Sequence, residues 1–250
     1  MKNFIKKIFR KTHIWFLNYI DQRRFNPQYS GIFINPFYFA RKGLYDNIKS
    51  IAPKISGKIL DVGCGTKPYK DLFLYEKYDG LEMDTPKTRE IGKADYFYDG
   101  NLFPFENSVY DVVLCNQVFE HIFEPDIFLQ ELSRVLKKDG LLLLTVPFIW
   151  DEHDQPYDYA RYSSFGISHI LIKNKFNILE QRKSVNSITV PFQMISEYIY
   201  KETQSKSLYV NLAVSIILIS PINIIGLFLS YILPVNNDLY LDNIILAKKT

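Results

Sequence analysis

The sequence predicts an α/β fold in which a doubly wound, mostly parallel sheet carries helices on both faces. Three observations support this class. Strand-like and helix-like segments alternate between residues 58 and 180. The strand-like segments are apolar on both faces, as in sheets buried between two helical layers. The first strand, KILDV at 58–62, runs into a turn that contains Gly63 and Gly65.

The elements follow one another in a regular order. Asn35-Pro36 begins a helix whose apolar stripe runs toward Pro53, where the helix ends. Helical patterns also cover 68–75, 125–140, closed by Gly140, and 163–173. Strands are predicted at 58–62, 78–84, within 94–105, and at 110–117, 141–148, 176–180 and 238–249.

The composition argues against a nucleic-acid partner and does not indicate any other partner. The net charge is +3 and charged residues make up 23% of the 250, which is too balanced to favour a nucleic-acid partner. The two cysteines, Cys64 and Cys115, lack the spacing of a zinc knuckle. We therefore expect reduced thiols in a cytoplasmic protein, no bound metal and no nucleic acid, while the oligomeric state stays open.

The N-terminal extension, residues 1–34, is basic and amphipathic. Within its first 20 residues, lysines and arginines interleave with aromatic and aliphatic side chains at helical spacing. No compact apolar core with a cleavage site follows, so the segment is not a signal peptide. Two interpretations remain open: a helix on the anionic inner face of a membrane, or a helix packed on the domain.

A second segment, 208–234, is apolar and lies in a charge-free interval from Ser207 to Asn237. Its length would span a bilayer, but Asn211, Pro221 and Asn223 divide it into two arms typical of interfacial or buried helices. If the strand at 238–249 joins the sheet, both ends of the segment lie on one side of any membrane. We expect a helical insertion before the last strand, either packed in the protein or entering the membrane.

Polar residues gather at the carboxyl ends of the predicted strands, where parallel sheets bind their ligands. The first strand ends in Asp61, Gly63, Cys64 and Gly65. Glu82 ends the second strand, 19 residues after Gly63, near the offset at which a carboxylate receives both ribose hydroxyls. Asp84 is the alternative candidate for this ribose-binding carboxylate. The third strand ends at Asp99 and the fourth at Cys115, Asn116 and Gln117.

The turn after the first strand favours a nucleotide-like ligand without phosphate. A dinucleotide site requires a third glycine opening a helix, and Pro68 stands there instead. The cationic sulfonium of S-adenosylmethionine suits a pocket rich in acids.

Four blocks resemble the class I S-adenosylmethionine-dependent methyltransferases, specifically the type 11 group: ILDVGCGTKPY, DGLE, DGNLFPFENSVYDVVLCNQVFEHI and ELSRVLKKDGLLLLTVP. The resemblance implies a seven-stranded Rossmann-like sheet over 35–250. It also implies that Asp61, Gly63, Cys64 and Gly65 line the methionine part of the cofactor, Glu82 its ribose hydroxyls, Asp99 the adenine amino group, and Asn116 the pocket wall. The segment KKDG at 137–140 departs from the two-glycine turn usual in this family, and we expect this difference to alter the end of the helix without affecting methyl transfer.

The loop 148–165 resembles that of a subgroup linked to cell-surface polysaccharide synthesis, which implies that this loop receives the acceptor. His153 in the loop and His121 after the fourth strand are candidate bases for a hydroxyl proton. His121 and Glu120 have the alternative role of capping the next helix. Tyr157 would stack on a sugar, and Arg161 would hold an acceptor anion or pair with Asp158.

We therefore expect a methyltransferase that acts on a small or lipid-linked acceptor, on a glycan or sugar hydroxyl. Two alternatives stay open. One is C-methylation of a quinone-like lipid, and the other is a non-catalytic module that binds the cofactor or a partner.

Overall fold

The computed structural model describes residues 19–20 and 23–250, so the helix expected over the first 20 residues lies for the most part outside the described residues. The chain divides into two compact units. The sheet unit comprises Asp46–Ser184 and Tyr240–Thr250, and the helical unit comprises residues up to Tyr45 together with Val185–Leu239. Each is described by itself.

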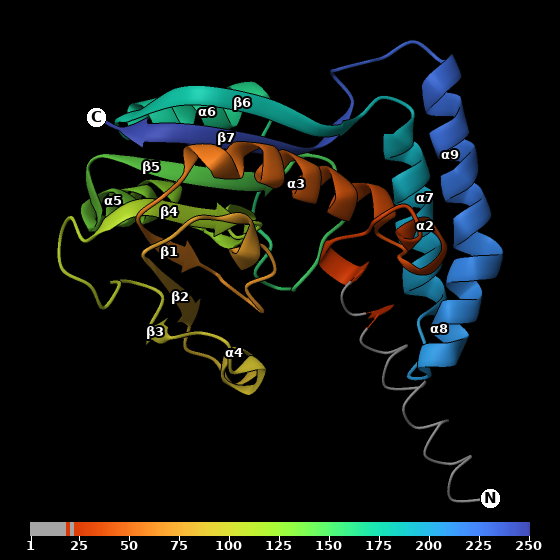
Figure 1. Ribbon diagram of the computed structural model, residues 1–250, viewed down its shortest axis with the longest axis horizontal. Coiled ribbons are helices and arrows are strands. Elements are labelled where there is room, and N and C mark those ends of the chain that lie inside the picture. The colour runs from red at the N-terminus through yellow and green to blue at the C-terminus, as the bar shows by residue number, and fades with distance from the viewer. Residues whose placement is uncertain (1–18, 21–22) are drawn as a thin grey trace, which may run out of the picture. The chain divides into compact units, whose positions relative to one another are not determined.

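A seven-stranded sheet organises the sheet unit, in the order β3-β2-β1-β4-β5-β7-β6. Neighbouring strands from β3 to β5 are parallel, and β7 is antiparallel to β5. Figure 1 shows the strands side by side in this order. The strands are β1 (Lys58–Val62), β2 (Lys77–Met83), β3 (Tyr96–Tyr98), β4 (Tyr110–Asn116), β5 (Leu136–Pro147), β6 (Phe176–Asn186) and β7 (Tyr240–Lys249). The predicted sheet and its seven strands are confirmed.

The main core of this unit lies between the sheet and two helices, α5 (Pro125–Val135) and α6 (Ser164–Lys173). Leu129 and Leu132 of α5 and Ile167 of α6 are fully buried with side chains of β1, β4 and β5. The other helices are α3 (Tyr38–Ile51), which crosses from one unit to the other, α4 (Pro86–Ile91), and the 3-10 turns η1 (Ala52–Lys54), η2 (Lys70–Leu72) and η3 (Phe119–His121).

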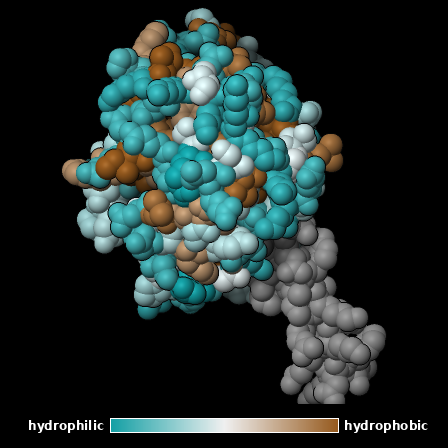
Figure 2. All heavy atoms as spheres, turned by 90° about the vertical axis from the view of Figure 1, so that its left-hand side faces the viewer, coloured by the Kyte–Doolittle hydropathy of each residue, from teal (hydrophilic) through white to brown (hydrophobic). Residues whose placement is uncertain are grey.

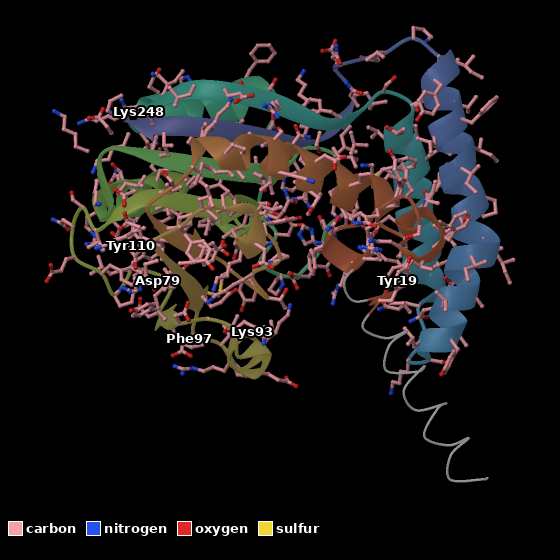
Figure 3. All side chains as sticks on the ribbon, in the orientation of Figure 1. Tyr19, Asp79, Lys93, Phe97, Tyr110 and Lys248 are labelled. Carbon is pink, nitrogen blue, oxygen red and sulfur yellow. The ribbon has the colours of Figure 1, made fainter. Side chains whose placement is uncertain are left out.

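A polar group is buried within the sheet beside this core. The hydroxyl of Tyr110 on β4 donates to Asp79 Oδ2 on β2 at 2.9 Å, across the intervening β1, and both side chains are labelled in Figure 3. Lys77 pairs with the same carboxylate at 2.8 Å. Figure 2 shows mostly hydrophilic residues on the left-hand side of Figure 1, with hydrophobic ones scattered among them.

Two predicted helices differ from the structure. The helix expected over 125–140 ends at Val135, because Leu136 already has extended backbone angles and pairs with Tyr110 in the sheet. Gly140 therefore lies in β5 and closes no helix. A Cβ there would lie 3.0 Å from Leu136 Cδ2 and from the Lys137 carbonyl oxygen, so the position beside the irregular pairing of β4 and β5 leaves little room for a side chain. The helix expected over 68–75 is reduced to the single turn η2.

The helical unit contains α2 (Gly31–Ile34), the first part of α3, α7 (Thr189–Thr203), α8 (Leu208–Val214), the π-helix η4 (Ser215–Ile219) and α9 (Ser220–Ile232). Gln193 of α7 holds the start of α3, where its Oε1 accepts from the backbone N–H of Phe39 at 3.0 Å. Gly226 of α9 packs on Phe192 of α7, where a Cβ would come within 2.7 Å.

The apolar segment is one continuous helix and not two separate arms. From Leu208 to Ile232 it forms 25 residues of helix, long and apolar enough to cross a membrane, the one such helix found among the described residues. The π-helical turn η4 lies directly before α9, and Pro221 stands in the first turn of α9 and supplies no backbone N–H to the helix. Asn223 is buried and its Oδ1 accepts from Ser196 Oγ at 2.9 Å.

Candidate functional site

The carboxyl ends of β3, β2, β1 and β4 are neighbours in the sheet, so the sequence-predicted residues meet along one edge. Asp99 follows β3, Glu82 lies near the end of β2, Gly63 and Gly65 follow β1, and Asn116 ends β4. This edge of the sheet, from Asp99 to Asn116, is called the crest below. Sequence spacing alone predicts which residues lie on it.

Glu82 is bonded to the glycine turn. Its Oε1 accepts from the backbone N–H of Gly65 at 2.6 Å, which fixes the carboxylate beside the turn. Burial raises the pKa of this carboxyl, while the backbone donors Gly65 and Met83 oppose the shift. The rival acid Asp84 is exposed and pairs instead with Arg89 of α4, at 2.7 and 2.8 Å. Of the two acids, Glu82 is therefore the one held at the turn.

The two glycines of the turn have different reasons to be glycine. Gly65 has a φ of +50°, and a Cβ placed on it would meet no described atom within 4 Å, so the turn leaves an open space there. Gly63 has a φ of +67°, but its Cβ would lie 2.2 Å from Cγ2 of Val118. The side chain of Val118 therefore leaves no room for a Cβ on Gly63, and of these two glycines only Gly65 borders open space.

Asp61 is buried at the end of β1. Tyr78 of β2 donates its hydroxyl to Asp61 Oδ2 at 2.7 Å. Burial raises the pKa of Asp61 to about 7, and the charge of Glu82 acts in the same direction. A cationic group placed beside Asp61 would favour its ionised form.

The other crest residues have modest local roles. Burial raises the pKa of Cys64 to about 12, so this thiol packs as a neutral group. Asp99 is exposed, and its Oδ1 accepts from the backbone N–H of Asn101 at 3.0 Å. The Oδ1 of Asn116 accepts from Thr145 of β5 at 2.7 Å, which ties the ends of β4 and β5.

The loop between β5 and α6 is organised by an ion pair. Arg161 donates to both carboxylate oxygens of Asp158, at 2.5 and 2.6 Å, and also to the carbonyl oxygen of Asp151 at 2.9 Å. Asp158 further accepts from the backbone N–H of His153 at 2.9 Å. This ion pair fixes the conformation of the loop. Burial acts to raise the pKa of Asp158, but the Arg161 guanidinium lowers it to about 2.

His121 and His153 come together from η3 and from this loop. Their ring centroids lie 4.9 Å apart. The Nδ1 of His121 lies 2.7 Å from the carbonyl oxygen of Tyr157, and the Nδ1 of His153 lies 3.2 Å from Asp158 Oδ2. Each ring is therefore oriented through Nδ1 and keeps Nε2 for other partners. Burial lowers the pKa of His121, which favours the neutral imidazole.

Glu120 is the residue of this site that the sequence did not predict. It is 0% exposed, and its Oε1 lies 3.9 Å from the Nε2 of each histidine. Among the described residues neither of its carboxylate oxygens has a hydrogen-bond partner, and burial raises its pKa to about 8. Neither Glu120 nor His121 caps α5, whose N-cap residue is Glu124. In the sequence, the only indication of this cluster was that Glu120 directly precedes His121.

Tyr157 is 57% exposed, and its backbone carbonyl oxygen lies 2.7 Å from the Nδ1 of His121. Its ring is therefore available at the surface of the loop. Of the residues predicted to receive an acceptor, Tyr157 faces solvent, whereas Asp158 and Arg161 bind each other.

Comparisons with known proteins agree with this geometry. A family model described as a methyltransferase domain matches residues 37–180, more than half of the chain. An uncharacterised protein of Methanocaldococcus jannaschii is 29% identical over 131 residues, which are 48% of this chain and 54% of that protein. An uncharacterised methyltransferase of Mycobacterium leprae is 32% identical over 108 residues, 40% of each chain. The match thus spans about half or less of these relatives.

The fold has solved counterparts. A candidate methyltransferase from Bacillus halodurans superposes with a TM-score of 0.51 at 16% identity, over 82% of this chain and 98% of that one. At this identity the likeness concerns the fold, which agrees with the sheet order found here. The matched segment contains the glycine turn, Glu82, Asn116 and His121. The chain belongs to the family of S-adenosylmethionine-dependent methyltransferase domains.

Proposed function

We propose that the protein transfers the methyl group of S-adenosylmethionine to an oxygen of a small or lipid-linked acceptor, a glycan or sugar hydroxyl. The observation that carries the choice of oxygen is the pair of imidazole Nε2 atoms that meet at Glu120, directly beyond β4. Neutral imidazoles accept the proton of a hydroxyl near neutral pH. His121 and His153 are the residues assigned to the acceptor.

The crest residues fit the cofactor. The open space at Gly65 would admit the methionine part, with Asp61 and Glu82 as the nearby acids. Glu82 would receive the ribose hydroxyls, Asp99 the adenine amino group, and Asn116 with Cys64 would form the wall. Lys67, the cation beside the turn, is already paired with Asp95 at 2.5 Å. The edge is therefore acidic overall, which suits a cationic ligand.

The cofactor, when bound, supplies an electrophilic methyl group on its sulfonium. The task of the chain is to hold the acceptor oxygen in line with that group, which accounts for much of the rate in such displacements. Loop 148–165, fixed by Asp158 and Arg161, would position the acceptor. Tyr157, exposed on this loop, would stack on a sugar face.

A lipid-linked acceptor is supported by the helix from Leu208 to Ile232. Only 28% of its most apolar window is buried within the protein. The exposed apolar side chains include Ile217 at 67%, Phe228 at 62% and Tyr231 at 81%. The chain leaves the sheet after β6 and returns to it in β7, so both ends of the insertion lie on one side of a bilayer. We place the protein in the cytoplasm, peripheral on the inner membrane face.

The subgroup assignment is part of the same proposal. Membership of the type 11 group is supported by the four sequence blocks between residues 58 and 147, and a place beside the enzymes of cell-surface polysaccharide synthesis by the loop sequence from Pro147 to Leu171. Residues 1–34 would form the basic extension, and 35–250 the methyltransferase domain with its insertion at 208–234.

The test uses radiolabelled methyl donor with membrane and soluble fractions of cells. We expect the purified protein to transfer label into lipid-extractable material of the membrane fraction, and acid hydrolysis to release an O-methyl sugar. Glu82→Ala is the matched inactive control. Label on a carbon of a quinone-like lipid would contradict transfer to a sugar oxygen and would favour the alternative, C-methylation of such a lipid. Cofactor binding with no labelled product in any fraction would mean a non-catalytic module.

A further inference from the structure

Three side chains with metal-binding atoms converge beside the crest: Glu120, His121 and His153. One ligand atom from each lies within 4.8 Å of the other two. The Oε1 of Glu120 lies 3.9 Å from both Nε2 atoms, so the carboxylate faces the two imidazoles together. Two histidines and one carboxylate are the protein ligands of many catalytic zinc and iron sites.

The orientation of the rings matches that of metal-bound histidines. Such histidines use one ring nitrogen for the ion and hold the other on a carbonyl or carboxylate oxygen. Here the Nδ1 of His121 lies at the Tyr157 carbonyl, and the Nδ1 of His153 lies near Asp158 and the Asp151 carbonyl. Asp158 is in turn fixed by Arg161. Both Nε2 atoms are thereby directed to one point.

The buried carboxylate is a second, independent observation. Glu120 is fully buried, and within the described part of the chain neither of its oxygens has a hydrogen-bond partner. A buried carboxyl without a partner is costly to ionise, and binding a cation removes that cost. Asp158 and Asp242 add negative charge around Glu120, and Arg161 adds positive charge. The surroundings therefore carry excess negative charge.

We infer that Glu120, His121 and His153 bind one divalent transition-metal ion through Oε1 and the two Nε2 atoms. A tetrahedral shell has ligand atoms about 3.4 Å apart, so the three donors close in by small side-chain rotations. The histidine side chains are 21% and 29% exposed, which leaves a further coordination position reachable from solvent. Binding of the ion requires no acceptor.

The use of that open position rests on the proposed function. An acceptor hydroxyl bound there would have a lowered pKa, as water does on zinc, and would release its proton to solvent, which reaches this position. The ion would then replace a single histidine base in stabilising the acceptor oxygen. Both histidines would then act as ligands of the same ion.

The test is a titration of chelator-stripped protein with Co²⁺, followed by its visible absorption, and with Zn²⁺ by calorimetry. We expect one ion per chain and absorption bands of nitrogen and oxygen ligands. Glu120→Gln and His153→Ala should each weaken binding at least tenfold. His169→Ala, which changes an exposed histidine on α6, should leave the affinity unchanged. Binding of S-adenosylhomocysteine within twofold of the parent shows that each variant is folded.

Three results would overturn the inference: no ion bound at millimolar concentration, binding retained in both variants, or near-ultraviolet thiolate bands that place the ion on a cysteine. Should Glu120→Gln fail to fold, His121→Asn takes its place. The inference and the proposed function fail separately. Methyl transfer that continues under full chelation would leave the proposed function standing, whereas ion binding without methyl transfer would leave the ion site standing.

Discussion

Glu82 accepts a hydrogen bond from the backbone N–H of Gly65 at 2.6 Å, which joins the end of β2 to the turn that follows β1. A carboxylate held in this way is oriented before any ligand arrives, so it loses little freedom on binding. The same contact gives the first prediction.

Glu82→Gln should lower the affinity for S-adenosylhomocysteine about tenfold, since a charged hydrogen-bond acceptor becomes a neutral one, at about 1.5 kcal/mol. Calorimetry measures the change directly. Asp84→Asn is the matched control, because Asp84 is exposed and pairs with Arg89. Equal affinities in Glu82→Gln and the parent would remove Glu82 from the cofactor site.

Gly63→Ala should destabilise the fold by about 2–4 kcal/mol, because its Cβ would overlap Val118 at a positive φ. Chemical denaturation measures the loss. In the Val118→Ala background the same substitution should cost clearly less, and an equal cost in both backgrounds would show that Val118 is not the obstacle.

Gly65→Ala should behave differently from Gly63→Ala. Its Cβ enters open space, so the fold should lose only about 1 kcal/mol for the left-handed backbone. The cofactor affinity should fall at least tenfold because the methyl group occupies the ligand's space. A large loss of stability with unchanged affinity would contradict this assignment.

The pKa of Asp61 gives a dependence on pH. Its folded value of about 7 lies above the ordinary 3.8, so the folded state keeps a proton that the unfolded state releases. The contribution of Asp61 to stability is thus present below about pH 4 and is lost as pH rises toward 7, at about 1.4 kcal/mol per pH unit. Asp61→Asn should remove this fall and still accept the Tyr78 hydroxyl. Parallel curves of stability against pH for both proteins would be inconsistent with a protonated Asp61.

Membrane contact through the helix from Leu208 to Ile232 is tested by vesicle flotation. Ile217→Asp with Phe228→Asp should abolish flotation with anionic vesicles and leave the unfolding temperature unchanged, since both side chains are exposed. Phe165→Asp, a change of a still more exposed apolar side chain on α6, should float like the parent. Flotation that survives the double change would assign membrane binding elsewhere or to residues 1–20.

Sequence patterns predicted the sheet well because each strand is a short apolar run and each carboxyl end bears polar residues. The pattern could not show where α5 ends. Leu136 continues its apolar stripe but pairs with Tyr110, so tertiary pairing overrides helical periodicity. The Glu120 site was missed for a related reason. The three side chains proposed to bind the ion come from η3 and from a loop beyond β5, and only the fold brings these segments together.

The position of the glycine turn was predicted correctly, but the reason why each position is glycine was predicted only in part. Positive φ at both glycines follows from the strand-to-turn geometry, but the crowding of Gly63 by Val118 is a contact between distant positions that no local motif encodes.

The most direct test of the central claim is a crystal structure of the protein with S-adenosylhomocysteine. The account predicts the ribose hydroxyls on the carboxylate of Glu82 and the amino-acid tail beside Gly65 and Asp61. A ligand bound away from the crest, or a crest left without ligand at saturating concentration, would contradict it.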